Sequence, residues 1–198
     1  GWKHMLVPSP NTLAKTSAMR SGEVHIVTLT KNPYAWLASM FRSPYHMQTE
    51  PGHRTQRRKS SVDGMSLESF LTQPWPTLGR ENAAGTIESP VQLWNVKNRA
   101  LAELPEHMAL HATTEQTILE PERTIRDIAD RFTIPMKQTA FVNFESSTKN
   151  RPLDQDGAYY RDYYLNEVWR EDLSAEAIDI INQQVDQELM QRFGYALI

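Results

Sequence analysis

The sequence contains no cysteine among its 198 residues. This absence excludes a disulfide framework, a thiol nucleophile and any metal site built on thiolates. It also fits a reducing compartment, and we expect the protein to be cytoplasmic. The histidines and carboxylates show no spacing that is typical of a zinc site, so we expect no metal.

Long apolar runs and a strong charge of either sign are also missing. No apolar run approaches the roughly 18 residues of a membrane-spanning helix, and no signal-peptide pattern is present, so we expect no membrane span. The net charge is −3 and the pI is about 6.1. Nothing global therefore favours nucleic acid or an anionic membrane as a partner, and a polyanionic ligand must be held by local basic clusters.

Glycine is scarce, and none of the eight glycines belongs to a phosphate-loop signature. Neither a Ser-Gly-Thr nor a Gly-Lys-Ser/Thr sequence occurs. Such loops bind phosphates through their backbone N–H groups. Their absence from these residues disfavours a Walker-type phosphoryl-transfer enzyme.

The composition that remains is ordinary for a globular protein, with 39% hydrophobic and 23% charged residues. The length is sufficient for one domain with a real core. No internal repeat or shift in composition divides the chain, so we expect a single domain over residues 1–198. The chain opens at Gly1-Trp2-Lys3-His4 without an initiator methionine, and we expect the domain to be incomplete at its N-terminus.

The rest of the chain is organised around the stretch 24–46. Residues 24–29 are β-branched and apolar, which predicts a buried strand. Lys31-Asn32 ends this run, and Pro33 suits the first position of a helix because its missing N–H costs nothing there. Beyond Pro33 the apolar residues follow the helical period. The stretch therefore predicts a strand that passes directly into a helix.

This strand-to-helix turn is a candidate anion site. Lys31 lies at the predicted helix start, where free N–H groups favour an anion, and the Ser39 hydroxyl follows eight residues later. The alternative interpretation is an ordinary turn of an α/β protein, because helix N-termini often attract anions without any function.

Lys31-Asn32-Pro33 followed by Ser39 resembles the 3′-phosphate-binding segment of the PAPS-dependent sulfotransferases, which use 3′-phosphoadenosine 5′-phosphosulfate. The extension over residues 42–46 resembles a bacterial branch of that family. The resemblance implies an α/β fold with a parallel sheet flanked by helices, similar to that of nucleotide kinases. It also implies that Lys31 and Ser39 bind the 3′-phosphate. The family usually has arginine where this chain has Lys31, so the bidentate fork is lost.

The segment 1–8 resembles a catalytic segment of the same family, which often carries Gly-Trp-Lys-His in this branch. The resemblance implies that His4 is the general base and that Lys3 stabilises charge on the sulfuryl group or the leaving phosphate. The acceptor must lose a proton as it attacks sulfur, and a histidine with a near-neutral pKa suits that task. The alternative is a mobile chain end with an exposed Lys-His pair.

Two further basic segments are candidates for ligand binding. The resemblance implies a late basic loop over the 3′-phosphate and adenine, with Lys149 and Arg151 as the candidate cofactor ligands. A plain surface loop is the alternative, although a nucleotide with two phosphate positions needs several donors. Residues 54–59 could meet a sulfated or carboxylated acceptor, but a solvated charge run is favoured.

Other segments predict structural elements rather than chemistry. Glu115 is expected to pin a loop through backbone N–H groups, and the tyrosine run 159–164 to pack rather than stack on a base. The helix after Pro121 is expected to bury Ile125 and Phe132 on one face. The remaining predictions are a helix over 66–71, a capped helix after Ser89-Pro90, a strand over 107–113 and a final helix over 174–193.

The family's loop for the 5′-phosphosulfate lies upstream of the Gly-Trp-Lys-His segment. We therefore expect a sulfotransferase fold that lacks its first βα unit, with sheet edges and apolar surface left exposed. The predicted function is transfer of a sulfuryl group from PAPS, the co-substrate, to a hydroxyl or amine of a small-molecule or glycan acceptor. The alternative is a non-catalytic nucleotide-binding module that keeps only the 3′-phosphate pocket.

Overall fold

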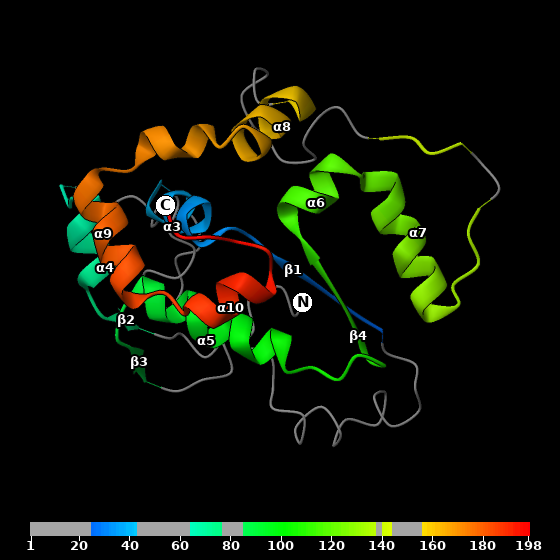
Figure 1. Ribbon diagram of the computed structural model, residues 1–198, viewed down its shortest axis with the longest axis horizontal. Coiled ribbons are helices and arrows are strands. Elements are labelled where there is room, and N and C mark those ends of the chain that lie inside the picture. Colours follow the sequence, from blue (N-terminus) through cyan, green and yellow to red (C-terminus); the bar gives the residue numbers. More distant parts are fainter. Residues whose placement is uncertain (1–24, 43–63, 77–84, 138–139, 144–155) are drawn as a thin grey trace, which may run out of the picture.

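The computed structural model describes residues 25–42, 64–76, 85–137, 140–143 and 156–198. Helices make up most of this part, together with a parallel and an antiparallel strand pair. Figure 1 shows α6 and α7 beside β4, with α3, α4 and α9 gathered towards the opposite end. The elements in chain order are β1 (Ile26–Thr30), α3 (Pro33–Arg42), α4 (Leu67–Thr72), β2 (Trp75–Pro76), β3 (Thr86–Ile87), α5 (Pro90–Ala102), β4 (Ala109–Thr113), α6 (Thr114–Leu119), α7 (Pro121–Phe132), α8 (Gly157–Leu165), the 3₁₀ helix η1 (Val168–Asp172), α9 (Ala175–Gln184) and α10 (Gln187–Arg192).

The strands β1 and β4 are parallel neighbours, and the chain between them contains α5. Their register places Val27 opposite Leu110 and Thr28 opposite His111. Parallel neighbours need a crossover connection, and a helix in that crossover is the hallmark of α/β architecture. The predicted α/β class with a parallel sheet is therefore confirmed. The short strands β2 and β3 form a separate antiparallel pair.

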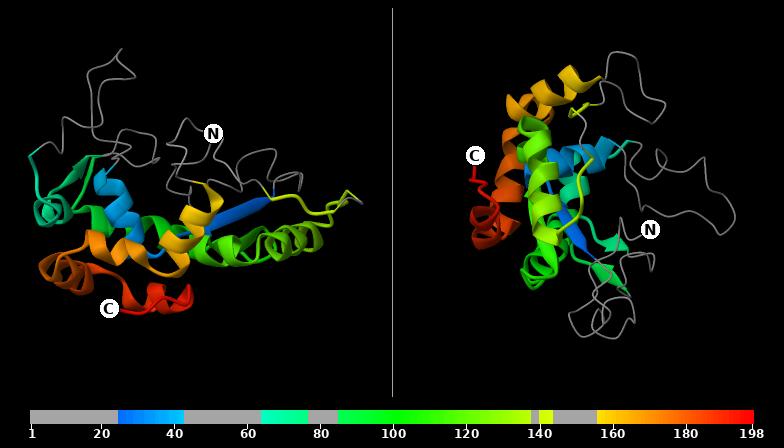
Figure 2. Two further views of the ribbon diagram at one scale, coloured as in Figure 1. Left: turned by 90° about the horizontal axis from the view of Figure 1, so that it is seen from above. Right: turned by 90° about the vertical axis from the view of Figure 1, so that its right-hand side faces the viewer.

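One face of the parallel pair is open and the other is covered. Val27 and Leu29 are 44% and 55% exposed, whereas Thr28 and Thr30 are buried. Figure 2 shows α9 and α10, in orange and red, on one side of β1. Parallel sheets are normally covered on both faces, so two exposed apolar side chains on one strand are unusual. The prediction of a buried strand over 24–29 is therefore only partly correct, because the apolar side chains of Val27 and Leu29 are the exposed ones.

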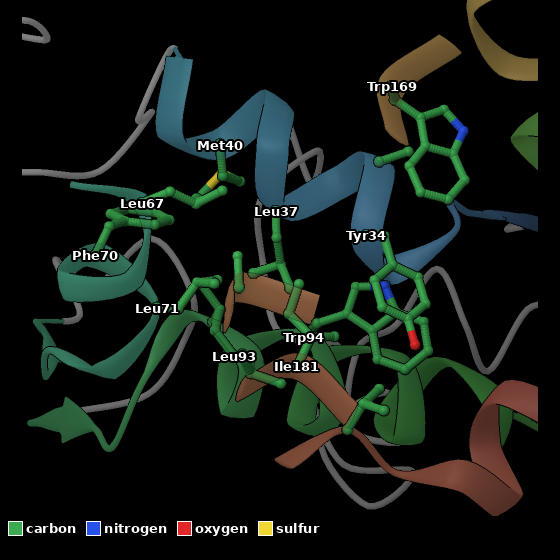
Figure 3. Close-up of a cluster of buried hydrophobic side chains, with 14 of the residues drawn as sticks. Tyr34, Leu37, Met40, Leu67, Phe70, Leu71, Leu93, Trp94, Trp169 and Ile181 are labelled. Carbon is green, nitrogen blue, oxygen red and sulfur yellow. The ribbon is translucent and has the colours of Figure 1, made fainter. Parts of the chain in front are cut away.

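The main core lies where α3 meets α4, α5 and α9, and Figure 3 shows their side chains pointing towards one another. Ala35 and Met40 are buried in addition to Tyr34, Leu37 and Ala38, because α4 and η1 also pack against this helix. The most deeply buried large side chains are Trp75, Trp94, Trp169, Tyr34, Phe70, Leu37, Leu71, Leu93, Ile181 and Met190.

Helix starts follow the local signals of the sequence. The side chains of Ser66, Ser89 and Ser174 each accept a hydrogen bond from the backbone N–H three residues later. Proline opens α3 at Pro33 and α5 at Pro90. Each cap satisfies one of the N–H groups that a helix start leaves unpaired, which explains why these starts are predictable.

The prediction of one final helix over 174–193 is wrong, because the chain breaks between α9 and α10. Asp186 caps α10 by accepting a hydrogen bond from the backbone N–H of Leu189 at 3.0 Å, and it also pairs with Arg99. Val185 at the break is buried. The apolar period therefore continues through the break, and periodicity alone could not reveal it.

The predicted buried face of α7 is also only partly correct. Ala129 and Phe132 are buried, but Ile125 is exposed. The helix packs beside β4 and carries Phe132 onto the ring of His25, with 4.5 Å between the ring centroids. Ile125 lies two turns earlier in α7, so the contact with the end of β1 does not cover it.

Candidate functional site

The carboxyl ends of β1 and β4 point towards one edge of the sheet, and the candidate site is built there. β1 leads into Lys31 and Asn32 before α3, while β4 leads into Glu115 in the first turn of α6. The helix α8 packs against α6 beside these strand ends (Figure 1). In open α/β sheets ligands bind outside the carboxyl ends of the strands. This edge is therefore where a ligand is expected.

Lys31 is half-buried and directed at α8. Its ammonium donates a hydrogen bond to the hydroxyl of Tyr164 at 2.7 Å, and it lies 4.6 Å from the centroid of the same ring. Both contacts stabilise a cation, one as a hydrogen bond and one through the ring quadrupole. The sequence signal for Tyr164 is the tyrosine run of α8 around Arg161, which predicts packing and not a contact with Lys31.

Two backbone donors of the turn are already engaged. The Asn32 N–H donates to Glu115 Oε1 at 3.2 Å, and the Tyr34 N–H donates to Asn32 Oδ1 at 3.0 Å. Pro33 has no N–H to offer. The expectation of free N–H groups at the start of this helix is therefore wrong at these positions. Among the side chains of this turn, the Lys31 ammonium is the one that carries a charge suited to an anion.

Glu115 links this turn to the C-terminal segment. Its Oε2 accepts a hydrogen bond from the Tyr195 hydroxyl at 2.6 Å while Oε1 holds the Asn32 N–H. Burial, together with the neighbouring Glu115 carboxylate, raises the pKa of Tyr195, so the phenol keeps its proton and goes on donating. The carboxylate also lies at the start of α3, where negative charge complements the helix dipole. The prediction that Glu115 pins a loop through a backbone N–H is confirmed.

The helix α5 holds the same turn from another side. The indole Nε1 of Trp94 donates to the Lys31 carbonyl at 3.0 Å. The Thr30 hydroxyl donates to Asn98 Oδ1 at 3.1 Å, one turn further along α5. Trp94 and Asn98 are both buried. The prediction that Trp94 is a core residue is confirmed, and its hydrogen bond to the Lys31 backbone is an addition that the sequence did not indicate.

The structure joins Lys31 to Tyr164 and does not join it to Ser39 by a hydrogen bond. Ser39 is half-buried in α3. At the usual helical rise it lies roughly 9 Å further along the axis than the first residue of that helix. The basic stretch 54–59 lies outside the described residues. So do the other predicted site residues, namely Lys3, His4, Lys149 and Arg151.

His111 is a second partly buried titratable side chain, on the covered face of the strand pair. Its Nδ1 lies 2.8 Å from Thr28 Oγ1, and its Nε2 is buried without a hydrogen-bond partner. Burial, followed by the positive charge of Arg192, lowers the pKa of His111. The ring is therefore held in its neutral form, and a second proton on it is disfavoured by the fold.

We expect the protein to lose stability as the pH is lowered from about 7 to 5, because the unfolded chain binds the His111 proton with an ordinary pKa of about 6.5 and the folded state binds it more weakly. For one proton the slope cannot exceed about 1.4 kcal/mol per pH unit. Urea unfolding of the wild type and of His111→Gln at both pH values measures this. The variant should show a smaller loss, and equal losses would contradict the assignment.

Within the described ranges, no group of three or more His, Asp or Glu side chains is arranged to hold a metal ion. No helix in the same ranges is long and apolar enough to cross a membrane. The chain matches no family model, no curated protein and no solved structure.

Proposed function

We propose that the protein is a sulfotransferase that moves a sulfuryl group from PAPS to a hydroxyl or amine of a small-molecule or glycan acceptor. The observation that carries the proposal is the Lys31 ammonium, held at the carboxyl end of β1 directly ahead of α3. A cation fixed at this point of a parallel sheet suits the 3′-phosphate of a nucleotide. The resemblance of Lys31-Asn32-Pro33 and Ser39 to the family segment supplies the nucleotide's identity.

The proposal also includes a specific fold within the α/β class. A nucleotide-kinase-like sulfotransferase fold is supported by the parallel pairing of β1 and β4. The exposed apolar side chains of Val27 and Leu29 leave a face on which such a fold would place further cover. The lack of cysteine supports placing the reaction in the cytoplasm.

The cofactor ligands in this proposal are Lys31, Ser39, Lys149 and Arg151. A nucleotide with phosphate groups on both sides of its ribose needs several cationic donors, and one lysine does not suffice. Lys31 is the member whose support is structural, because α5 fixes its carbonyl and α8 its ammonium. No metal ion takes part in the proposed reaction.

The proposed chemistry is an in-line substitution at sulfur. The acceptor oxygen or nitrogen forms a bond to sulfur, and the bond from sulfur to the bridging oxygen of the nucleotide breaks. The 3′,5′-bisphosphate then leaves with the electron pair of that bond. His4 takes the acceptor's proton, and Lys3 stabilises the charge that develops on the bridging oxygen. The test of the base is His4→Ala, which should slow transfer and spare nucleotide binding.

A non-catalytic module that binds the same nucleotide is the second candidate. Its support is the same fixed Lys31 ammonium, which can hold a 3′-phosphate whether or not a group is transferred. The two candidates agree on the 3′-phosphate pocket and differ on turnover. Release of adenosine 3′,5′-bisphosphate from PAPS in the presence of acceptor mixtures separates them.

The direct test of the pocket is calorimetric titration with adenosine 3′,5′-bisphosphate and with AMP. We expect the wild type to prefer the bisphosphate, because only that nucleotide presents a 3′-phosphate to Lys31. Lys31→Met should weaken bisphosphate binding about ten- to a hundredfold, the usual value of a hydrogen bond to a charged group, and should leave AMP unaffected.

Lys137→Met is the matched control, because Lys137 is an exposed lysine beyond the C-terminus of α7. It removes the same charge from the protein without touching the turn after β1, so both nucleotides should bind it as they bind the wild type. Equal affinity of the wild type for the two nucleotides would remove the cofactor assignment.

A further inference from the structure

We infer that two copies of this chain associate through the outer edge of β1, the edge that faces away from β4. The occupant of this edge is the β1 strand of a second copy, and the two strands run antiparallel about a two-fold axis at Thr28. The inference goes beyond the proposed function and does not depend on it. The contact is made by backbone groups and by the side chains of Val27 and Leu29, and it involves no nucleotide.

The direction of the backbone groups of β1 is the first argument. The Ile26 N–H donates to the Met108 carbonyl at 3.1 Å, so the backbone groups of Ile26 face β4. Successive residues of a strand present their N–H and C=O groups to alternate sides. The backbone groups of Val27 and Leu29 therefore point to the outer edge. Within the described residues, the parallel sheet contains only β1 and β4, so no further strand pairs with this edge.

The lack of protection on this edge is the second argument. Proteins usually keep a sheet edge from pairing with a charged side chain, a proline or a bulge. The sequence of β1 is Ile-Val-Thr-Leu-Thr, and its register with β4 continues over all five residues. These five residues include no charge, no proline and no bulge. Such an edge is a template for another strand, so the occupant that fits it is an extended backbone.

The exposed side chains of β1 are the third argument. Val27 and Leu29 are 44% and 55% exposed, and both lie on the open face of the strand pair. A strand added at the outer edge places its own side chains beside them on this face. Apolar surface of both copies then leaves water, which favours association. The second copy therefore covers the part of β1 that the fold of one chain leaves open.

The symmetry of the pairing selects a second copy of β1 as the occupant. In an antiparallel pair, the residues that exchange two backbone hydrogen bonds lie directly opposite each other. With the axis at Thr28, Val27 of each copy lies opposite Leu29 of the other, and these are the residues whose backbone groups point outward. Because β1 carries no charge, no like charges meet across the axis. Each copy uses its own open edge, so the assembly closes as a dimer.

The test measures the molar mass in solution by sedimentation equilibrium over a range of protein concentrations. For the wild type we expect a mass that rises towards twice the 22.8 kDa of one chain. The combined variant Val27→Lys with Leu29→Lys places like charges directly opposite each other in the pair. Its dissociation constant should therefore be at least about tenfold higher. Both positions are exposed, so the single chain can accommodate the lysines.

A charge-reversed variant makes the test specific for this pairing. Val27→Glu with Leu29→Glu should also prevent self-association. An equimolar mixture of the lysine and glutamate variants should dimerise again, because opposite charges then face each other across the pair. The matched control is Val96→Lys with Leu119→Lys, since these residues are 46% and 56% exposed and lie on α5 and α6. It adds the same charge and should keep the mass of the wild type.

Hydrogen exchange measures the backbone contact itself. In the wild-type dimer, the Val27 and Leu29 N–H groups should exchange more slowly than in the monomeric lysine variant. A wild type that stays monomeric at every concentration, or a dimer that the lysine variant leaves intact, would overturn the inference. Slow exchange of both N–H groups in a monomer would also overturn it, because another segment of the same chain would then occupy the edge.

Discussion

Trp94→Ala is expected to lower the free energy of unfolding by about 3–5 kcal/mol, the usual loss when a buried tryptophan is truncated. Trp94 is 1% exposed and lies with Tyr34, Leu37 and Ile181 where α3, α5 and α9 meet (Figure 3). The truncation removes the largest side chain that α5 contributes to this core. It also removes the donor to the Lys31 carbonyl. Urea denaturation followed by far-UV circular dichroism measures the loss.

The stability lost with the hydrogen bond of Trp94 can be measured separately from the stability lost with its side-chain volume. Trp94→Phe and Trp169→Phe remove the same atoms from two tryptophans that are each 1% exposed. The Trp94 Nε1 donates to Lys31, whereas the Trp169 Nε1 is buried without a partner. Trp94→Phe should therefore cost about 1 kcal/mol more than Trp169→Phe. Equal losses in the two variants would show that the bond to Lys31 carries no net stability.

Local chemistry explains which parts of the fold the sequence could predict. Pro33 removes an N–H where a helix does not need one, and apolar periodicity changes at the same residue, so the passage from β1 to α3 was predictable. Serine caps and Pro90 made the starts of other helices predictable in the same way. These signals act between residues at most a few positions apart. They establish the α/β class and place Lys31 at the end of a strand.

The site itself depends on contacts that have no local signature. Lys31 meets Tyr164 across 133 residues, Asn32 meets Glu115 across 83, and Tyr195 meets Glu115 across 80. No periodicity or cap connects such pairs, because the fold alone decides which distant side chains become neighbours. The prediction of free N–H groups failed for this reason. That prediction considered the start of α3 by itself and did not include the Glu115 carboxylate of α6, which accepts a hydrogen bond from the Asn32 N–H.

The difference between local sequence signals and contacts with distant elements also explains which residues of β1 are buried. The β-branched, apolar run over 24–29 predicts a buried strand. In the structure Val27 and Leu29 are exposed, and the buried positions are Thr28 and Thr30. Those threonines are satisfied by His111 and Asn98 respectively, so their burial leaves no hydroxyl unpaired. Burial on this strand follows hydrogen-bond partners on distant elements rather than the hydrophobic pattern.

Glu115→Ala is expected to lower the free energy of unfolding by about 2–4 kcal/mol, because it deprives two donors of their acceptor at once. The Asn32 N–H loses Oε1, and the Tyr195 hydroxyl loses Oε2. The phenol keeps a longer contact of 3.4 Å to the Thr30 carbonyl, which softens the second loss. Glu115→Gln is the matched control. Its amide oxygen can still accept from one donor, so its loss should be clearly smaller.

A double-mutant cycle with Tyr195→Phe identifies the share that belongs to the Glu115–Tyr195 bond. Once Glu115 is alanine, removing the Tyr195 hydroxyl should cost little, since the buried group that lost its partner is itself gone. We expect a coupling of about 1–2 kcal/mol between the two changes. Additive losses would mean that Glu115 acts through Asn32 alone. In either case the turn that carries Lys31 loses a contact. The affinity for the bisphosphate that we propose as the ligand should therefore be lower in Glu115→Gln than in the wild type, and lowest in Glu115→Ala.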